Sequence, residues 1–194
     1  MVAHVPSYGK CGTLASGRGT LMPKLTTERL LMRPITESDV DALQAFWNDP
    51  EVRRYLWADQ IMSRETIAEL ISASQACFAK LGTGFFAIEV SARPGTLVGF
   101  CGHRLFEDGS HVELRYGMLP EYWGEGFVTE AAHEVLRYGF EECGIEYVIG
   151  ATETPNQRAV RTMQRLGMVF DERREFHGLD TVFYKLHKHE FAIA

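Results

Sequence analysis

The stretch LPEYWGEGFVTEAA, residues 119–132, decides the fold of this chain. An apolar run over residues 112–119, with the composition of a β-strand, stops at a proline. Gly124 and Gly126 follow, and a helix-period pattern then runs from about residue 126 to 142. A glycine turn that feeds a helix N-terminus leaves backbone N–H groups unpaired at the positive end of the helix dipole. Because glycine lets a phosphate approach the backbone closely, the stretch predicts a pyrophosphate cradle.

The glycine pattern by itself is equally typical of an ordinary tight turn between a strand and a helix. Neither a Gly-x-Gly-x-x-Gly motif nor the Lys-Ser/Thr pair of a P-loop accompanies it. The sequence on either side of the turn therefore has to decide between a structural turn and a phosphate site.

Four separated motifs resemble, in their order along the chain, the GNAT acetyltransferases, and most of all the RimJ/RimL type that acetylates the N-termini of ribosomal proteins. These are TTERLLMRP at residues 26–34 with Ser38-Asp39 behind it, NDPEV at 48–52, YWGEGFVTEA at 122–131, and Asn156 followed by Leu166-Gly167-Met168. The resemblance runs from about Leu25 to Leu186. It implies one GNAT N-acetyltransferase domain over residues 23–194, behind a glycine-containing N-terminal extension at residues 1–22.

The order of the patterns predicts a mixed α/β fold of the α+β kind, because strands first follow one another and later alternate with helices. The resemblance implies the GNAT fold, a single mixed and mostly antiparallel sheet of about six to seven strands flanked by about four helices. Strands are expected at residues 25–32, 85–90, 97–105, 112–119, 147–151, 169–176 and 181–187. Helices are expected at residues 36–48, from 63 to about 81, from about 126 to 142, and from a Thr154 cap to Gly167.

Composition limits the function. A chain of 194 residues with 45% apolar and 24% charged residues fits one soluble globular domain. Its net charge of −6, without a basic block, argues against a nucleic-acid partner. No apolar run is long enough for a membrane span or a secretory signal. The four cysteines are widely spaced, so we expect neither a zinc site nor a disulfide framework, and a cytoplasmic location. A homodimer ordered by residues 1–22 stays open.

The resemblance implies acetyl-coenzyme A as the co-substrate, with no metal. Its pyrophosphate would lie on the backbone amides of the turn, which comprises Gly124, Glu125, Gly126, Phe127, Val128 and Thr129. Its pantetheine arm would pair with the end of the preceding strand, at Tyr116, Gly117 and Met118. A backbone N–H near Met118 or Leu119 would polarise the acetyl carbonyl. Asn156 would contact the arm, and its alternative role is to cap the following helix.

Some positions depart from the family pattern. Glu121, Glu125 and Glu130 place three carboxylates around a site for a dianion, which would weaken binding. Met163 stands where many GNAT enzymes have a tyrosine that protonates the leaving thiolate, and Ala159 stands where the RimJ/RimL type often has serine. No general acid can therefore be assigned.

Glu113 is the candidate catalytic base, since alternating apolar neighbours would shield it and raise its pKa. Its alternatives are a place on a solvated strand face or an ion pair with Arg115, and His111 and His103 are reserve bases. The expected reaction is direct acetyl transfer in a ternary complex to a primary amine: a protein N-terminus, an amino acid or a small molecule. Trp47, Tyr55 and Trp57 would line the acceptor pocket. A different class, an acyl-coenzyme A-binding or regulatory module with little catalysis, also fits the empty acid positions.

Overall fold

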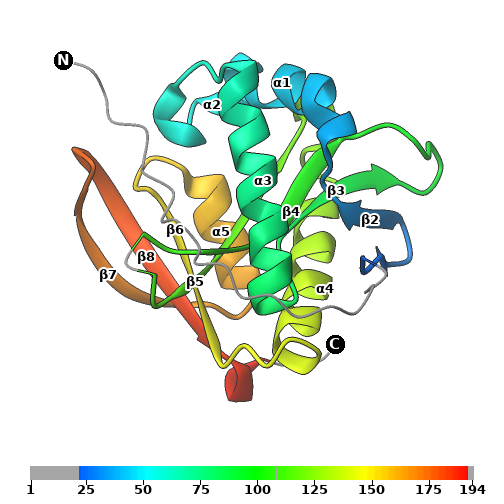
Figure 1. Cartoon of the computed structure of the whole chain (residues 1–194). Helices are drawn as coiled ribbons and strands as arrows, with labels where there is room; N and C mark the ends of the chain where they lie inside the picture. The colour runs from blue at the N-terminus through cyan, green and yellow to red at the C-terminus, as the bar shows by residue number, and fades with distance from the viewer. Residues whose placement is uncertain (1–21, 108, 192–194) are drawn as a thin grey trace.

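The structure, a computed structural model, describes residues 22–107 and 109–191. These residues form one eight-stranded sheet in the order β1-β2-β3-β4-β5-β6-β8-β7 (Figure 1). All neighbouring strands are antiparallel except β5 and β6, which are parallel. The strands are β1 Leu25–Thr26, β2 Leu30–Pro34, β3 Phe85–Val90, β4 Gly99–Leu105, β5 Val112–Met118, β6 Tyr147–Glu153, β7 Val169–Phe176 and β8 Leu179–His187.

Five α-helices and four 3-10 turns complete the described part of the chain. The helices are α1 Val40–Asn48, α2 Pro50–Arg53, α3 Arg64–Leu81, α4 Phe127–Glu141 and α5 Gln157–Arg165. The turns are η1 Glu37–Asp39, η2 Trp57–Asp59, η3 Pro120–Tyr122 and η4 Lys188–Glu190. No described helix is long and apolar enough to cross a membrane.

The helices cover both faces of the sheet. Successive side chains along a strand point to opposite faces, so each strand packs against helices on both sides. On β4, Cys101 packs into a core cluster with residues of α4 and α5. Its neighbour Phe100 packs into a second cluster with residues of α1 and α3. The sheet is therefore the middle of three layers, as Figure 1 shows with α3 in front and α4 behind.

The sheet opens between β5 and β6. β5 pairs with β4 along all seven of its residues, from Val112 to Met118. It pairs with β6 only at Glu113, opposite Ile149. Figure 1 shows the carboxyl-terminal halves of β5 and β6 diverging, with α5 between them in this view. We call this opening the wedge, and it ends at the glycine turn before α4.

The expected fold class is confirmed, with two corrections of detail. The sheet has eight strands and the described chain has five α-helices, because a two-residue strand (β1) and a four-residue helix (α2) are too short for a periodic pattern. The fifth helix begins at Gln157, and its cap is Asn156 rather than Thr154. The Thr154 hydroxyl instead donates to the carbonyl oxygen of Asp180 on β8. The expected extension falls almost wholly on residues 1–21, which lie outside the described residues.

Candidate functional site

The glycine turn has the backbone that the cradle prediction requires. Gly124 and Gly126 have φ angles of +85° and +81°, in the left-handed region that favours glycine. Gly126 is the N-cap of α4 and receives no side-chain capping bond. The first helical bond of α4 runs from the N–H of Glu130 to the carbonyl oxygen of Gly126. The N–H groups of residues 127–129 precede that bond, so they have no partner within the helix.

The space over the turn is open. A Cβ atom built on Gly124 would meet no heavy atom within 4 Å, and one built on Gly126 would meet only Arg29 Nη2, at 3.6 Å. Backbone amides at a helix N-terminus, with no side chain over them, are the donor set that binds pyrophosphate. The described residues therefore fit the pyrophosphate of acetyl-coenzyme A.

Arg29, on the turn between β1 and β2, braces this cradle. Its guanidinium donates to the carbonyl oxygen of Glu125 (3.0 Å) and to the carboxylate of Glu130 (2.7 Å from Nε). It also lies over the Phe127 ring, 4.5 Å from the centroid. Sequence reasoning missed this role, although Arg29 belongs to the first of the four motifs and could have been found there.

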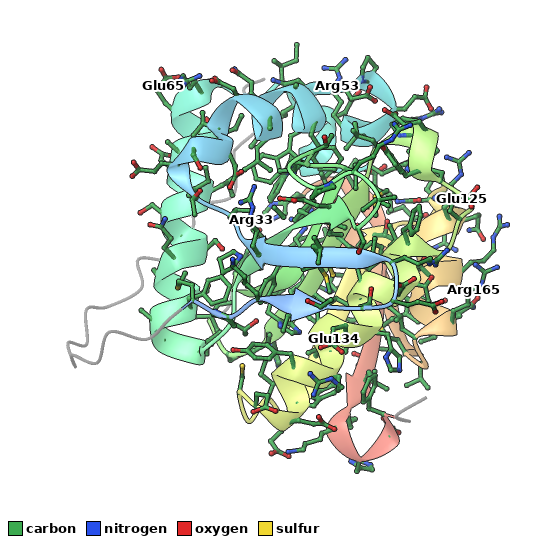
Figure 2. All side chains as sticks on the ribbon, turned by 90° about the vertical axis from the view of Figure 1, so that its right-hand side faces the viewer. Arg33, Arg53, Glu65, Glu125, Glu134 and Arg165 are labelled. Carbon is green, nitrogen blue, oxygen red and sulfur yellow. The ribbon has the colours of Figure 1, made fainter. Side chains whose placement is uncertain are left out.

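The same brace changes the role expected of Glu130. Its carboxylate accepts a hydrogen bond from the Thr27 hydroxyl (2.5 Å) as well as those from Arg29. Burial would raise the pKa of Glu130, but these hydrogen bonds and the Arg29 charge outweigh it and lower the pKa below its usual value. Glu130 is thus a neutralised structural carboxylate. The repulsion expected from three carboxylates reduces to that of Glu121 and Glu125, which are both exposed. Figure 2 shows Glu125 at the outer edge of the molecule.

The end of β5 leaves a backbone edge free toward the wedge. The N–H of Leu119 donates to the carbonyl oxygen of Val98 on the β4 side (2.9 Å). Because backbone groups alternate sides along a strand, the N–H and carbonyl of Met118 point away from β4. The Met118 carbonyl accepts the indole N–H of Trp123 (2.7 Å), which leaves the Met118 N–H directed into the wedge. Of the two expected oxyanion donors, Met118 is the one with the suitable direction.

Tyr116 and Asn156 fasten α5 to the wedge. The Tyr116 hydroxyl donates to the carbonyl oxygen of Ala159 (3.2 Å), and burial raises the pKa of this phenol well above its usual value. Asn156 Oδ1 accepts from the N–H of Ala159 (3.3 Å), and Nδ2 donates to the Thr152 hydroxyl (2.9 Å). The capping alternative for Asn156 is therefore present in the structure, and its cofactor contact stays a prediction. Met163, at the usual acid position, is 2% exposed and belongs to the core.

Glu113 is buried, as expected, but its partner is not Arg115. Its carboxylate lies 2.5 Å from Nε of Arg104, the residue directly opposite on β4. Arg115 lies instead over the ring of Trp57, 4.2 Å from the centroid. Glu113 also sits at the point where β5 and β6 are still paired, so it is at the closed end of the wedge. Its role as base stays a prediction.

The reserve bases are no better placed. His103 has no exposed surface, its Nδ1 lies 3.1 Å from the Thr83 hydroxyl, and burial lowers its pKa to about 3. His111 lies beside Tyr147, 5.5 Å between ring centroids. His111 also lines a hollow beside the amino-terminal end of β6, with Tyr147 and Ile149, which is the opposite end from the glycine turn.

Of the three aromatic residues expected to line the acceptor pocket, two are buried and one is partly exposed. Trp47 has no exposed surface and packs edge-to-face on Phe100, so it belongs to the core and lines no open pocket. Trp57 is 8% exposed and packs on Trp47, with ring centroids 5.5 Å apart. Tyr55 is partly exposed.

The comparison with known families decides what the wedge and the glycine turn belong to. Residues 29–169 match the model described as Acetyltransferase (GNAT) domain. The chain belongs to the GNAT acetyltransferase family. An N-acetyltransferase of Bacillus subtilis (strain 168) described as uncharacterized, YoaA, is 30% identical over 150 residues, covering 76% of this chain and 83% of its own.

Solved structures share the fold of this GNAT acetyltransferase. An acetyltransferase from Agrobacterium tumefaciens str. C58 superposes with a TM-score of 0.73 at 23% identity, covering 88% of this chain and 99% of its own. RimL, a ribosomal L7/L12 alpha-N-protein acetyltransferase solved in complex with coenzyme A, superposes with a TM-score of 0.69 at 14% identity. The match covers 83% of this chain and 95% of RimL. The resemblance to the RimJ/RimL type is confirmed at the level of the fold. Among the described residues, no three His, Cys, Asp or Glu side chains gather as metal ligands.

Proposed function

We propose that this GNAT acetyltransferase moves the acetyl group of acetyl-coenzyme A to a primary amine, by direct transfer in a ternary complex. The observation that carries the proposal is the wedge between β5 and β6, which leads to an uncapped helix N-terminus at Gly126. One opening thus offers a strand edge for an extended arm and a cluster of amides for its pyrophosphate.

The roles of the cofactor-binding residues follow from this placement. The backbone amides from Gly124 to Thr129 hold the pyrophosphate, and the free edge at Tyr116–Met118 hydrogen-bonds the pantetheine arm. The Met118 N–H then faces the thioester carbonyl and stabilises the negative charge that develops on its oxygen. Asn156 holds the start of α5 against the same arm.

The chemistry needs little more from the protein than position. The lone pair of the amine attacks the acetyl carbon, the carbon–sulfur bond breaks, and the sulfur leaves as a thiolate. Thiols ionise near pH 8.5, so a thiolate can depart without a dedicated acid. This fits the presence of Ala159 and buried Met163 at the usual acid positions. The attacking amine must lose a proton, and Glu113 is proposed to receive it, directly or through a water.

Coenzyme A binding and thiol release test this function together. We expect acetyl-coenzyme A to raise the melting temperature, and a panel of protein N-terminal peptides, amino acids and small amines to include acceptors that release the free thiol. Unchanged melting with saturating acetyl-coenzyme A would refute the proposal. A second candidate, an acyl-coenzyme A-binding or regulatory module, is favoured by the missing acid residues. It predicts binding without thiol release from any acceptor. The cysteine pattern supports a cytoplasmic location for either function.

A further inference from the structure

Trp123 and Arg158 join the two sides of the wedge at its open end. Trp123 precedes Gly124 in the glycine turn, and Arg158 lies in the first turn of α5, the helix that follows β6. The Arg158 guanidinium lies over the Trp123 ring, 4.2 Å from the centroid. A side chain from the β6 side of the wedge therefore reaches the turn on which we expect the pyrophosphate to lie.

Both partners of this contact are held in place. The indole N–H of Trp123 donates to the Met118 carbonyl oxygen (2.7 Å), which fixes the ring against the end of β5. The first turn of α5 is held by the Tyr116 hydroxyl, which donates to the carbonyl oxygen of Ala159 (3.2 Å). Arg158 therefore extends from an anchored backbone to an anchored ring, which limits the conformations that its long side chain would otherwise sample.

This position leaves the hydrogen-bonding groups of Arg158 available to a ligand. A contact with an aromatic face does not give the N–H donors of a guanidinium an oxygen acceptor. Among the described residues, no carboxylate or other hydrogen-bond acceptor is bonded to the Arg158 guanidinium, and the residue is exposed. The planar fork of guanidinium donors is the arrangement that binds two phosphate oxygens at once.

The charge balance at the glycine turn favours a second cation there. Arg29 is paired with the Glu130 carboxylate, 2.6 Å from Nη2, so its charge already neutralises that group. Glu121 in η3 and Glu125 in the turn are exposed carboxylates, and carboxylates repel a phosphate. Arg158 approaches from α5 without a carboxylate partner among the described residues, so its charge can offset this repulsion.

We propose that Arg158 binds the pyrophosphate of acetyl-coenzyme A from the α5 side of the wedge, across from the backbone amides of the glycine turn. The phosphate oxygens are then held on two sides, by the amides at the start of α4 and by a guanidinium that belongs to α5. This inference rests on the proposed acetyl-coenzyme A site, and it adds a charged side chain of a second element to that site. Arg158 binds the cofactor and takes no part in proton transfer.

Arg158→Gln tests the proposal with two ligands, coenzyme A and 3′-dephospho-coenzyme A, which both contain the pyrophosphate. In isothermal titration calorimetry at low salt, we expect the variant to bind each ligand about tenfold more weakly than wild type does, which is the scale of one charge-assisted hydrogen bond. The two losses should be equal, because both ligands keep the group that Arg158 binds. The difference between variant and wild type should shrink as salt is raised, since the missing interaction is ionic.

Arg165→Gln is the matched control. Arg165 is exposed and lies in the last turn of α5, about two turns or roughly 10 Å further along the helix than Arg158. Figure 2 shows Arg165 at the same outer edge of the molecule as Glu125. This variant removes the same charge from the same helix and should bind both ligands as wild type does. Because both arginines are exposed, both variants should melt close to the wild-type temperature.

The proposal is overturned if Arg158→Gln binds coenzyme A as tightly as wild type does, or if Arg165→Gln loses as much affinity. A loss confined to coenzyme A would assign Arg158 to the 3′-phosphate and overturn the pyrophosphate assignment. A loss that does not change with salt would mean a structural effect on α5 and would overturn it as well. Coenzyme A binding by wild type is measured first: its absence refutes the proposed function, whereas wild-type binding with an unaffected Arg158→Gln refutes only the role of Arg158.

Discussion

Alanine at Gly126 is the sharpest test of the cradle. Gly126 has φ +81°, where an L-residue costs roughly 1–2 kcal/mol. The added Cβ would meet only Arg29 Nη2, at 3.6 Å, an ordinary van der Waals contact. The substitution therefore strains the backbone without a clash inside the protein. For a chain of this length, that strain lowers the melting temperature by roughly 2–8 °C.

The effect on binding is separate from the strain. The Cβ of Gly126→Ala would enter the otherwise open space at the glycine turn, where we expect the pyrophosphate to lie. We expect acetyl-coenzyme A to bind at least about tenfold more weakly, a loss of about 1.4 kcal/mol in binding free energy. Isothermal titration calorimetry below the melting transition measures this directly.

Gly144→Ala supplies the matched control. Gly144 follows the other end of α4, has φ +69°, and a Cβ there would meet no heavy atom within 4 Å. It should lose a similar amount of stability and keep the wild-type affinity. Equal affinities of the two alanine variants for acetyl-coenzyme A would refute the cradle, because strain alone would then account for everything observed.

Three further predictions concern charge and protonation. Glu125→Lys should tighten acetyl-coenzyme A binding at low salt, and the gain in affinity should shrink as salt is raised, since Glu125 is exposed. Calorimetry at two salt concentrations measures this gain. Weaker binding of the variant at low salt would place this side chain away from the phosphates. Glu113→Gln should lower turnover by roughly 10²–10⁴-fold with cofactor affinity unchanged. Arg104→Gln, which breaks the same ion pair, should lose stability and retain most turnover. Equal turnover losses in the two variants would mean that Glu113 has only a structural role. His103 stays neutral in the folded protein because its pKa is about 3, so its contribution to stability is complete above pH 6.5 and is lost as pH falls toward 3. Urea unfolding at pH 7 and pH 5 should show a larger loss of unfolding free energy for wild type than for His103→Leu. Equal losses in the two proteins would contradict this prediction.

The sequence alone determined the local features of the site. The strand that ends at Pro120, the two glycines and the helix after them follow from residue spacing and from the conformational freedom of glycine, which depend only on near neighbours. The structure has the strand at Val112–Met118 and the helix at Phe127–Glu141, close to the expected bounds. The cradle could therefore be predicted before any tertiary contact was known.

Only the tertiary structure decided how charged side chains pair. Glu130 looked like a repulsive charge in sequence because Arg29, its partner, lies 101 residues away. Glu113 is paired with Arg104 across β4 and β5, although Arg115 is closer in sequence, because residues two apart on a strand are not cross-strand neighbours. Periodicity shows which face of an element a residue occupies, but the partner on that face depends on which strands and turns the fold brings together.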